Sequence, residues 1–192
     1  MNRIVRFGLA AGCLLALPGM AGAAGRTPPP AMAVTHVFLA RHAERFATGD
    51  DPTLTPAGAR RSALLGRMLR SANVTAIFTT QFERAKATAD SVSAATGAPV
   101  EIVHSDSSAR LARIVRERFR GRTVAVIGHS DSLPNVVAEL GWEGDEATKP
   151  WSYDDLCLLE LRGDEPPRLL HLHYGGAADT TGMSGTAMAR PR

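Results

Sequence analysis

Residues 34–45 read VTHVFLARHAER, so an apolar, β-branched run passes directly into a cluster of charged residues. The apolar part, residues 34–40, predicts a buried strand. The charged part begins with Arg41 and His42, immediately where this strand ends. In α/β proteins ligands bind beyond the carboxyl ends of the strands, so this stretch indicates a functional site at one edge of such a sheet.

The remainder of the chain alternates between strand and helix patterns. Further strands are expected at residues 74–79, 100–103 and 123–127. Helices are expected from the Thr55-Pro56 start, over residues 83–96, around residues 111–119 and over residues 131–140. Two apolar runs, residues 156–161 and 169–174, flank a Gly163-Asp164 turn and predict a hairpin. This order predicts an α/β fold, a single three-layer α/β/α domain with a mostly parallel sheet, helices on both faces and a C-terminal hairpin.

The first 23 residues have the pattern of a secretory signal peptide. Arg3 and Arg6 precede an apolar stretch over residues 7–20, and Ala21-Gly22-Ala23 offers a small-residue cleavage site. The apolar stretch is short for a membrane span, so an uncleaved anchor is the less favoured alternative. We therefore expect a periplasmic or secreted protein without stable membrane insertion. Its parts would be a signal peptide (1–23), a Pro-rich spacer (24–32), a domain (33–175) and a flexible tail (176–192).

Charge and cysteine content narrow the function classes further. The formal net charge of the whole chain is +3, and it falls to +1 when Arg3 and Arg6 leave with the signal peptide. A charge this small predicts no general nucleic-acid partner. Removal of Cys13 leaves Cys157 alone, which excludes an intramolecular disulfide, and its apolar neighbours indicate a small buried core residue.

Basic residues and histidines recur at the carboxyl ends of the predicted strands. Arg41 and His42 follow the first strand, Arg84 starts the helix after the second, and His129 follows the fourth. The planar guanidinium fork suits phosphate, so this edge predicts an anion site. Nearby positive charge lowers the pKa of a histidine and keeps its imidazole neutral, which favours covalent catalysis at phosphorus.

Four segments, in order along the chain, resemble the signature segments of the histidine phosphatase (phosphoglycerate mutase-like) superfamily. They are FLARHAE (38–44), DPTLTPAG (51–58), IFTTQFERAKATA (77–89) and VAVIGHSDSLP (124–134). Each lies in the strand–loop–helix context that the superfamily has. The resemblance implies a phosphoric monoester hydrolase that works through a phosphohistidine.

The resemblance also implies roles for individual residues. His42 would be the nucleophile that becomes phosphorylated. Arg41, Arg84 and His129 would bind the phosphoryl group, and Arg45 stands where some branches carry a further basic ligand. The resemblance implies no metal or other cofactor.

The proton donor is left open by the sequence. Some branches carry a glutamate after the third strand, and others an aspartate directly after the second histidine, whereas here Ser130 follows that histidine. Glu101 and Asp106 are conceivable donors, but Glu44 and Asp131 are favoured because both flank the predicted anion site. Asp131 is also a typical helix N-cap, which is the commoner use of such a residue.

Two further features invite a functional interpretation. His171 and His173 lie at strand period on one face, as a metal pair would. No third ligand occurs at a convincing spacing, so we expect a half-exposed strand face and no metal. Residues 149–151 form a candidate lid.

The function predicted on these grounds is an exported phosphatase acting on a phosphorylated small molecule or phosphoprotein. A phosphohistidine or phosphoprotein phosphatase is an alternative, and so are a mutase-like phosphotransferase and a non-catalytic phosphate-binding protein. The segments that could shield a mutase intermediate look short. Both histidines of the predicted site are present, which argues against loss of activity.

Overall fold

The computed structural model describes residues 33–176, which form a six-stranded sheet with the strand order β3-β2-β4-β1-β5-β6. The strands are β1 (Val34–Arg41), β2 (Val74–Thr79), β3 (Val100–Ile102), β4 (Thr123–Gly128), β5 (Asp155–Arg162) and β6 (Arg168–His173). Pairs among the first four strands are parallel, whereas β5 is antiparallel to both β1 and β6. The predicted mostly parallel sheet and C-terminal hairpin are confirmed.

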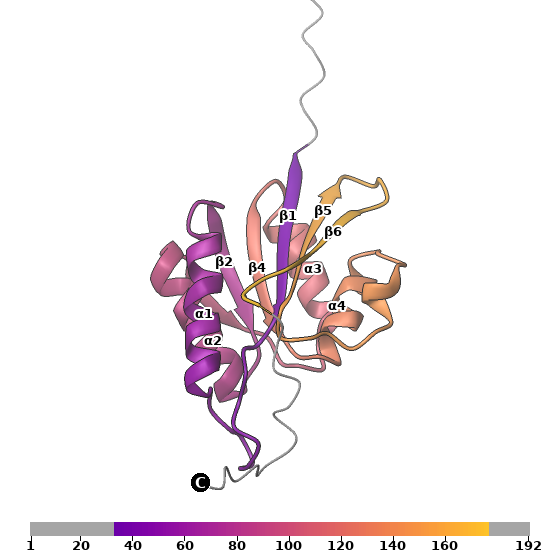
Figure 1. The fold of residues 1–192 in the computed structure, drawn as a ribbon. Coiled ribbons are helices and arrows are strands. Elements are labelled where there is room, and N and C mark those ends of the chain that lie inside the picture. Colours follow the sequence, from indigo (N-terminus) through magenta and orange to yellow (C-terminus); the bar gives the residue numbers. More distant parts are fainter. Residues whose placement is uncertain (1–32, 177–192) are drawn as a thin grey trace, which may run out of the picture. The chain divides into compact units, whose positions relative to one another are not determined.

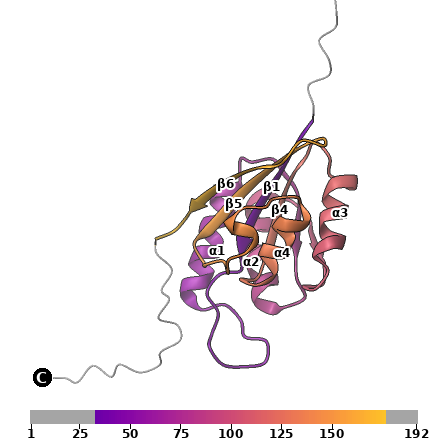
Figure 2. The same ribbon diagram turned by 90° about the vertical axis from the view of Figure 1, so that its right-hand side faces the viewer.

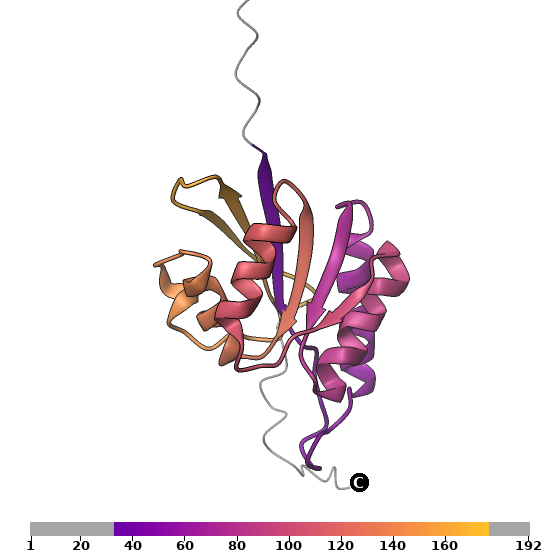
Figure 3. The same cartoon turned by 180° about the vertical axis from the view of Figure 1, so that it is seen from behind.

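Helices cover both faces of the sheet. They are α1 (Pro56–Leu69), α2 (Glu83–Thr96), α3 (Ser108–Arg118) and α4 (Ser132–Glu139), followed by a short 3₁₀ turn, η1 (Asp145–Ala147). α1 and α2 lie together on one face, and α3 and α4 lie on the other, as Figures 1 and 3 show from opposite sides. The predicted three-layer α/β/α arrangement is therefore confirmed.

The core has one apolar layer on each side of the sheet. Leu39 and Phe78 pack toward α3 and α4, whereas Ile77 and Ile127 pack toward α1 and α2. Neighbouring residues of a strand point to opposite faces, so strands covered on both sides are apolar throughout. This double coverage explains the continuous apolar runs in the sequence.

The hairpin at the sheet edge is less covered than the parallel strands. Figure 2 views the molecule from the side that carries β5 and β6. Leu170 and Leu172 of β6 are exposed, whereas Cys157 of β5 is fully buried and not in a disulfide. Burial raises the pKa of the Cys157 thiol to about 12, as expected for a core residue.

A capping residue and two glycines determine where α1 and α2 begin, end and pack. The Thr55 hydroxyl accepts a hydrogen bond from the Gly58 amide and caps α1. A side chain at Gly58 would meet the Glu44 carbonyl oxygen at 2.1 Å, so only glycine lets α1 approach the loop after β1 this closely. Gly97 ends α2 in the left-handed region, with a φ of 75°.

The predicted signal peptide and spacer, and all but the first residue of the predicted tail, lie outside the described residues. Within residues 33–176, no helix has the length and apolar character needed to cross a membrane.

Candidate active site

Parallel pairing of β1 with β4 places two histidines side by side. Arg41 is opposite Gly128 in the strand register, so the residues that follow them, His42 and His129, leave the sheet together. The His42 amide donates to the Gly128 carbonyl at 2.9 Å, and the two imidazole centroids lie 5.1 Å apart. Arg84, at the start of α2, donates from Nε to His42 Nε2 at 3.2 Å. The structure thus gathers the basic residues that the sequence pattern predicted at one edge.

The surroundings of His42 fix which ring nitrogen carries its proton. Nδ1 lies 2.8 Å from the Ala43 carbonyl oxygen, which can only accept, so the proton is assigned to Nδ1. Nε2 is then left with a lone pair. The pKa of His42 is lowered to about 3, mainly by burial and also by the positive charges of His129, Arg41 and Arg84, while the hydrogen bond to Ala43 acts in the opposite direction. His42 is therefore a neutral imidazole with an available lone pair on Nε2.

His129 is held by residues that motif reasoning did not assign. Its Nε2 lies 2.7 Å from the Thr80 hydroxyl, and its ring meets the Phe82 ring edge-on at 5.1 Å. Burial lowers the pKa of His129 to about 4, with Arg84 as the next largest cause. Thr80 lies inside the segment quoted above, but nothing in the sequence distinguishes it from its neighbours.

Arg41 has one donor that the protein does not satisfy. Its Nη1 donates to the Trp151 carbonyl at 3.0 Å, and its guanidinium lies 3.9 Å from the centre of the Tyr153 ring. Its Nε is buried and finds no acceptor among residues 33–176. A buried donor without an acceptor is costly, so this geometry favours an anionic ligand beside Arg41. Burial lowers the pKa of Arg41 for the same reason.

The structure does not support the interpretation of Trp151, in the candidate lid of residues 149–151, as part of a mobile cover. Trp151 is only 4% exposed and belongs to the core beside α3 and α4, so it is a support for Arg41 rather than a mobile cover. Tyr153 stands over Arg41 and meets the His42 ring at 5.7 Å. Sequence reasoning missed Tyr153 because it lies in a loop without any recognisable motif.

Arg84 is paired with an acid in this structure. Its Nη1 lies 3.2 Å from Asp51 Oδ1, and both Asp51 carboxylate oxygens accept from the Glu83 amide at the start of α2. Asp51 thus orients Arg84 and caps the helix that carries it. Arg45 is exposed and donates to the Phe46 carbonyl, but its charge lowers the pKa of both Arg41 and Arg84.

The two favoured acids have different environments. Glu44 lies in a buried ion pair, with its Oε1 2.7 Å from Arg61 Nε, and Arg61 also donates to the Tyr174 carbonyl. That Glu44 is a proton donor stays a prediction: its Oε1 is held in this ion pair, whereas its Oε2 is buried and has no hydrogen-bond partner among residues 33–176. Asp131 occupies the N-cap position of α4, yet its side chain makes no capping hydrogen bond. Its charge raises the pKa of Arg41, Arg84 and His129, which places it beside the basic cluster.

The other two conceivable acids are paired elsewhere. Glu101 binds Arg118 of α3, and Asp106 binds His104 in the loop before α3. Neither is among the charged groups with the largest effects on the pKa of His42 or His129. Of the four acids considered, Asp131 is the one whose charge acts on Arg41, Arg84 and His129.

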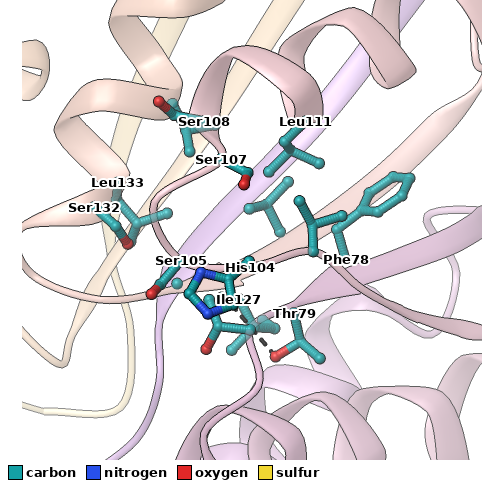
Figure 4. Close-up of a pocket in the computed structure, with 15 residues that line it drawn as sticks. Phe78, Thr79, His104, Ser105, Ser107, Ser108, Leu111, Ile127, Ser132 and Leu133 are labelled. Atoms are coloured by element: carbon teal, nitrogen blue, oxygen red, sulfur yellow. Dashed lines mark hydrogen bonds between the residues drawn. The ribbon is translucent and has the colours of Figure 1, made fainter.

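A small cavity lies next to the site, between the carboxyl ends of β2 and β4 and the loop before α3 (Figure 4). Its volume is about 20 Å³, roughly the space of one water molecule. Thr80 and Gly128 line it on the side of the site, and Ser105, Ser107 and Ser132 line it elsewhere. It is too small to hold a substrate.

Comparison with known families adds an independent observation. A model of the histidine phosphatase superfamily (branch 1) matches residues 37–105, which include Arg41, His42 and Arg84. Over these residues the chain is similar to the histidine phosphatase superfamily. His129 lies beyond the matched residues, and it is the pairing of β4 with β1 that places it beside His42.

Solved structures of known phosphatases share the fold of this domain. The protein histidine phosphatase SixA complexed with tungstate is 20% identical, with 72% of this chain and 96% of that chain covered and a TM-score of 0.60. A mycobacterial glucosyl-3-phosphoglycerate phosphatase is 14% identical, with 66% and 90% covered and a TM-score of 0.57. Bacillus stearothermophilus YhfR is 19% identical, with 67% and 92% covered and a TM-score of 0.56. None of the curated proteins compared with this chain matches it significantly.

Proposed function

We propose that this protein is an exported phosphatase that hydrolyses phosphate monoesters through a phosphohistidine on His42. One observation carries the proposal. The lone pair on His42 Nε2 faces the Arg84 guanidinium at 3.2 Å, while the proton on Nδ1 is held by the Ala43 carbonyl. A neutral nucleophile beside cationic donors suits attack on a phosphate dianion.

In the first step, His42 Nε2 attacks phosphorus and forms a P–N bond as the ester P–O bond breaks. The Asp131 carboxyl gives its proton to the leaving oxygen, which departs as an alcohol. Arg41 and Arg84 donate to the non-bridging oxygens and balance the charge that spreads over them. The buried Nε of Arg41, which has no acceptor among the described residues, supplies one such donor.

In the second step, water attacks phosphorus while the Asp131 carboxylate takes one of its protons. The P–N bond breaks, its electron pair returns to Nε2, and inorganic phosphate leaves. His42 thereby returns to the neutral tautomer in which it began. The Ala43 carbonyl favours this cycle because it keeps the Nδ1 proton in place throughout.

The decisive experiment looks for the covalent intermediate. The purified protein is mixed with a ³²P-labelled monoester, quenched rapidly, and tested for acid-labile, base-stable protein-bound phosphate, as a P–N bond requires. Hydrolysis of p-nitrophenyl phosphate is measured in parallel, with and without EDTA. We expect labelling and EDTA-resistant activity in the wild type, and neither in His42→Asn. Activity that survives in His42→Asn would refute the proposal.

The same labelling separates two alternatives. A mutase-like phosphotransferase would return the labelled phosphoryl group to an acceptor rather than release inorganic phosphate. A non-catalytic binding protein would be protected by phosphate against unfolding but would never become labelled.

A phosphohistidine or phosphoprotein phosphatase is the second candidate. The alignment covers 96% of the protein histidine phosphatase SixA, so this domain matches nearly the whole of a protein named for that activity. A ratio of kcat/KM between a phosphohistidine protein and small monoesters distinguishes the two functions. A strong preference for the protein would replace the monoesterase proposal while keeping His42 as nucleophile.

Export is proposed from the pattern of residues 1–23. The test is fractionation of cells that express the full chain, followed by N-terminal sequencing of the product. A periplasmic or secreted protein that begins at Ala24 would support export with cleavage. An uncleaved product in the membrane fraction would support the anchor instead.

A further inference from the structure

A second pair of histidines, His171 and His173, lies on β6 of the β5–β6 hairpin. His171 Nε2 lies 3.0 Å and His173 Nδ1 lies 3.3 Å from the same oxygen, Oδ1 of Asp155. The three ligand atoms lie within 4.8 Å of one another. Motif spacing offered no third ligand for this pair, and the structure supplies Asp155.

The hairpin register builds this cluster. His173 is directly opposite Asp155 in the antiparallel pairing, and His171 is two residues earlier on β6. Cross-strand partners point to the same face of a sheet, and so do residues at a spacing of two. All three side chains therefore converge on one side of the hairpin without any distortion of the backbone.

The spacing of the ligand atoms suits a small divalent ion. Zinc binds imidazole nitrogen and carboxylate oxygen at about 2.0–2.2 Å, so the ligands of a tetrahedral site lie roughly 3.3 Å apart. The two observed separations, 3.0 and 3.3 Å, are close to that value. Two imidazoles and one carboxylate are also the donor set of a zinc site that keeps a fourth position open.

An outer layer of hydrogen bonds orients the ligands. Glu146 Oε1 lies 3.3 Å from His171 Nδ1, so the Nε2 lone pair of His171 can face an ion. Glu146 is in turn fixed by the Trp142 indole, which donates to it at 2.8 Å. The Ser152 amide donates to Asp155 Oδ2 at 2.6 Å and leaves Oδ1 for the ion. Metal-bound histidines and carboxylates are commonly oriented in this way.

The charge of the cluster also favours a cation. Asp154 adds a third carboxylate, 3.7 Å from His173 Nδ1. Within residues 33–176, no lysine or arginine forms a salt bridge with Glu146, Asp154 or Asp155. When both imidazoles are neutral, the carboxylates of Glu146, Asp154 and Asp155 leave the cluster with a net negative charge, which a divalent cation would balance.

We propose that Asp155, His171 and His173 bind a divalent transition-metal ion of the zinc class. The ion takes no part in phosphoryl transfer, and the proposal does not depend on the function proposed above. Its effect is on the support of the active site. The Trp151 ring stacks on His171 with centroids 6.4 Å apart, and the Trp151 carbonyl accepts from Arg41. A bound ion would hold His171, and through it the segment that positions Arg41.

The test is titration of the tag-free protein, stripped with EDTA and dialysed, with zinc chloride in a calorimeter. We expect one zinc ion per chain. His173→Ala and Asp155→Asn should weaken binding at least about 10-fold, and Glu146→Gln about 10-fold, since loss of an orienting partner has that effect. The matched control is His104→Ala, because His104 also pairs with an aspartate but has no second histidine beside it.

A second readout does not depend on affinity. Cobalt chloride should give the visible absorption of four-coordinate cobalt in the wild type and in His104→Ala, but not in His173→Ala. His42→Asn should bind zinc like the wild type, which separates this site from the catalytic histidines. Absence of zinc binding by folded wild type would overturn the proposal. Binding that is lost in His42→Asn, or unchanged in His173→Ala, would overturn it equally.

Discussion

The two histidine pairs of this molecule lie on one sheet but in opposite electrostatic surroundings. His42 and His129 stand among Arg41, Arg45 and Arg84 at the carboxyl ends of parallel strands. His171 and His173 stand among Glu146, Asp154 and Asp155 on the antiparallel hairpin.

The difference shows that the neighbours of an imidazole, more than the imidazole itself, decide its chemistry. Cations and burial keep His42 uncharged, so its lone pair is available for phosphorus. Carboxylates beside His171 and His173 instead favour a metal cation. In the parallel pair, the residues that would bind an anion meet because both strands end at the same edge of the sheet. In the antiparallel pair, the residues that would bind a cation meet because they are opposite each other in the strand register.

The largest expected difference is between variants that each lack one histidine of one pair. His42→Asn should lower kcat for p-nitrophenyl phosphate by at least about 10³-fold, since the nucleophile is lost. In EDTA-stripped protein, where no ion ties His171 to the segment that positions Arg41, His173→Asn should leave kcat within about twofold, because His173 itself touches no residue of the proposed mechanism. Steady-state kinetics on both purified variants give the comparison. Equal losses would mean that the two pairs are not functionally separate.

A smaller loss is expected when the positive surroundings of His42 are weakened. Arg84→Ala should lower kcat/KM by roughly 10²-fold, because one donor to the transition-state oxygens disappears. Arg84→Lys should recover only part of this, since lysine lacks the planar fork. Arg118→Ala serves as the control, because Arg118 binds Glu101 on the exposed side of α3. A full recovery with lysine would show that charge alone matters.

Substitution of Asp131 should affect activity, whereas substitution of Glu44 should affect stability. Asp131→Asn should reduce kcat by about 10²-fold on alkyl phosphates, and less on p-nitrophenyl phosphate, whose leaving group needs little protonation. Glu44→Gln should instead lower the unfolding free energy by roughly 3 kcal/mol, because Arg61 is left in a broken buried ion pair. Urea denaturation and kinetics on both variants test this division. If Glu44→Gln lost activity and Asp131→Asn lost stability, Glu44 would be the proton donor.

The last expected effect concerns stability in acid and is absent at neutral pH. His42 has a pKa of about 3 in the folded protein, against an ordinary value of 6.5. Between these values the unfolded chain binds a proton that the folded chain refuses, so stability is full above pH 6.5 and declines as pH falls toward 3. His42→Gln should remove part of this decline, on the order of a few kcal/mol at pH 4. Urea titrations at pH 7 and pH 4 measure it, and an identical decline in the variant would exclude His42 as its source.

Local sequence patterns predicted most of the fold. The ranges predicted for β2 and α2 agree with the observed Val74–Thr79 and Glu83–Thr96. These boundaries depend on neighbouring residues, such as the left-handed Gly97 that ends α2. The four basic and histidine residues of the site were also predictable, because each follows a strand whose end is readable from the sequence.

What the sequence could not supply were contacts between distant segments. Asp155 was missed as a partner of His171 and His173 because the predicted hairpin strand began one residue later, at residue 156. Tyr153 reaches Arg41 only because β5 lies beside β1. Such pairings depend on strand order, for which no local pattern exists. The ion pair of Glu44 was not predicted for a related reason, because its partner Arg61 lies on a helix whose packing the sequence does not give.

The position of β1 in the sheet has a consequence for the order of folding. Both of its neighbours, β4 and β5, come from the second half of the domain. A chain emerging from the ribosome therefore cannot complete the strand that carries the nucleophile until Arg162 has been made. Pairings between such distant segments form slowly. A half-synthesised chain thus has neither a finished sheet nor an anion site, and this delay suits a protein proposed to cross a membrane before it folds.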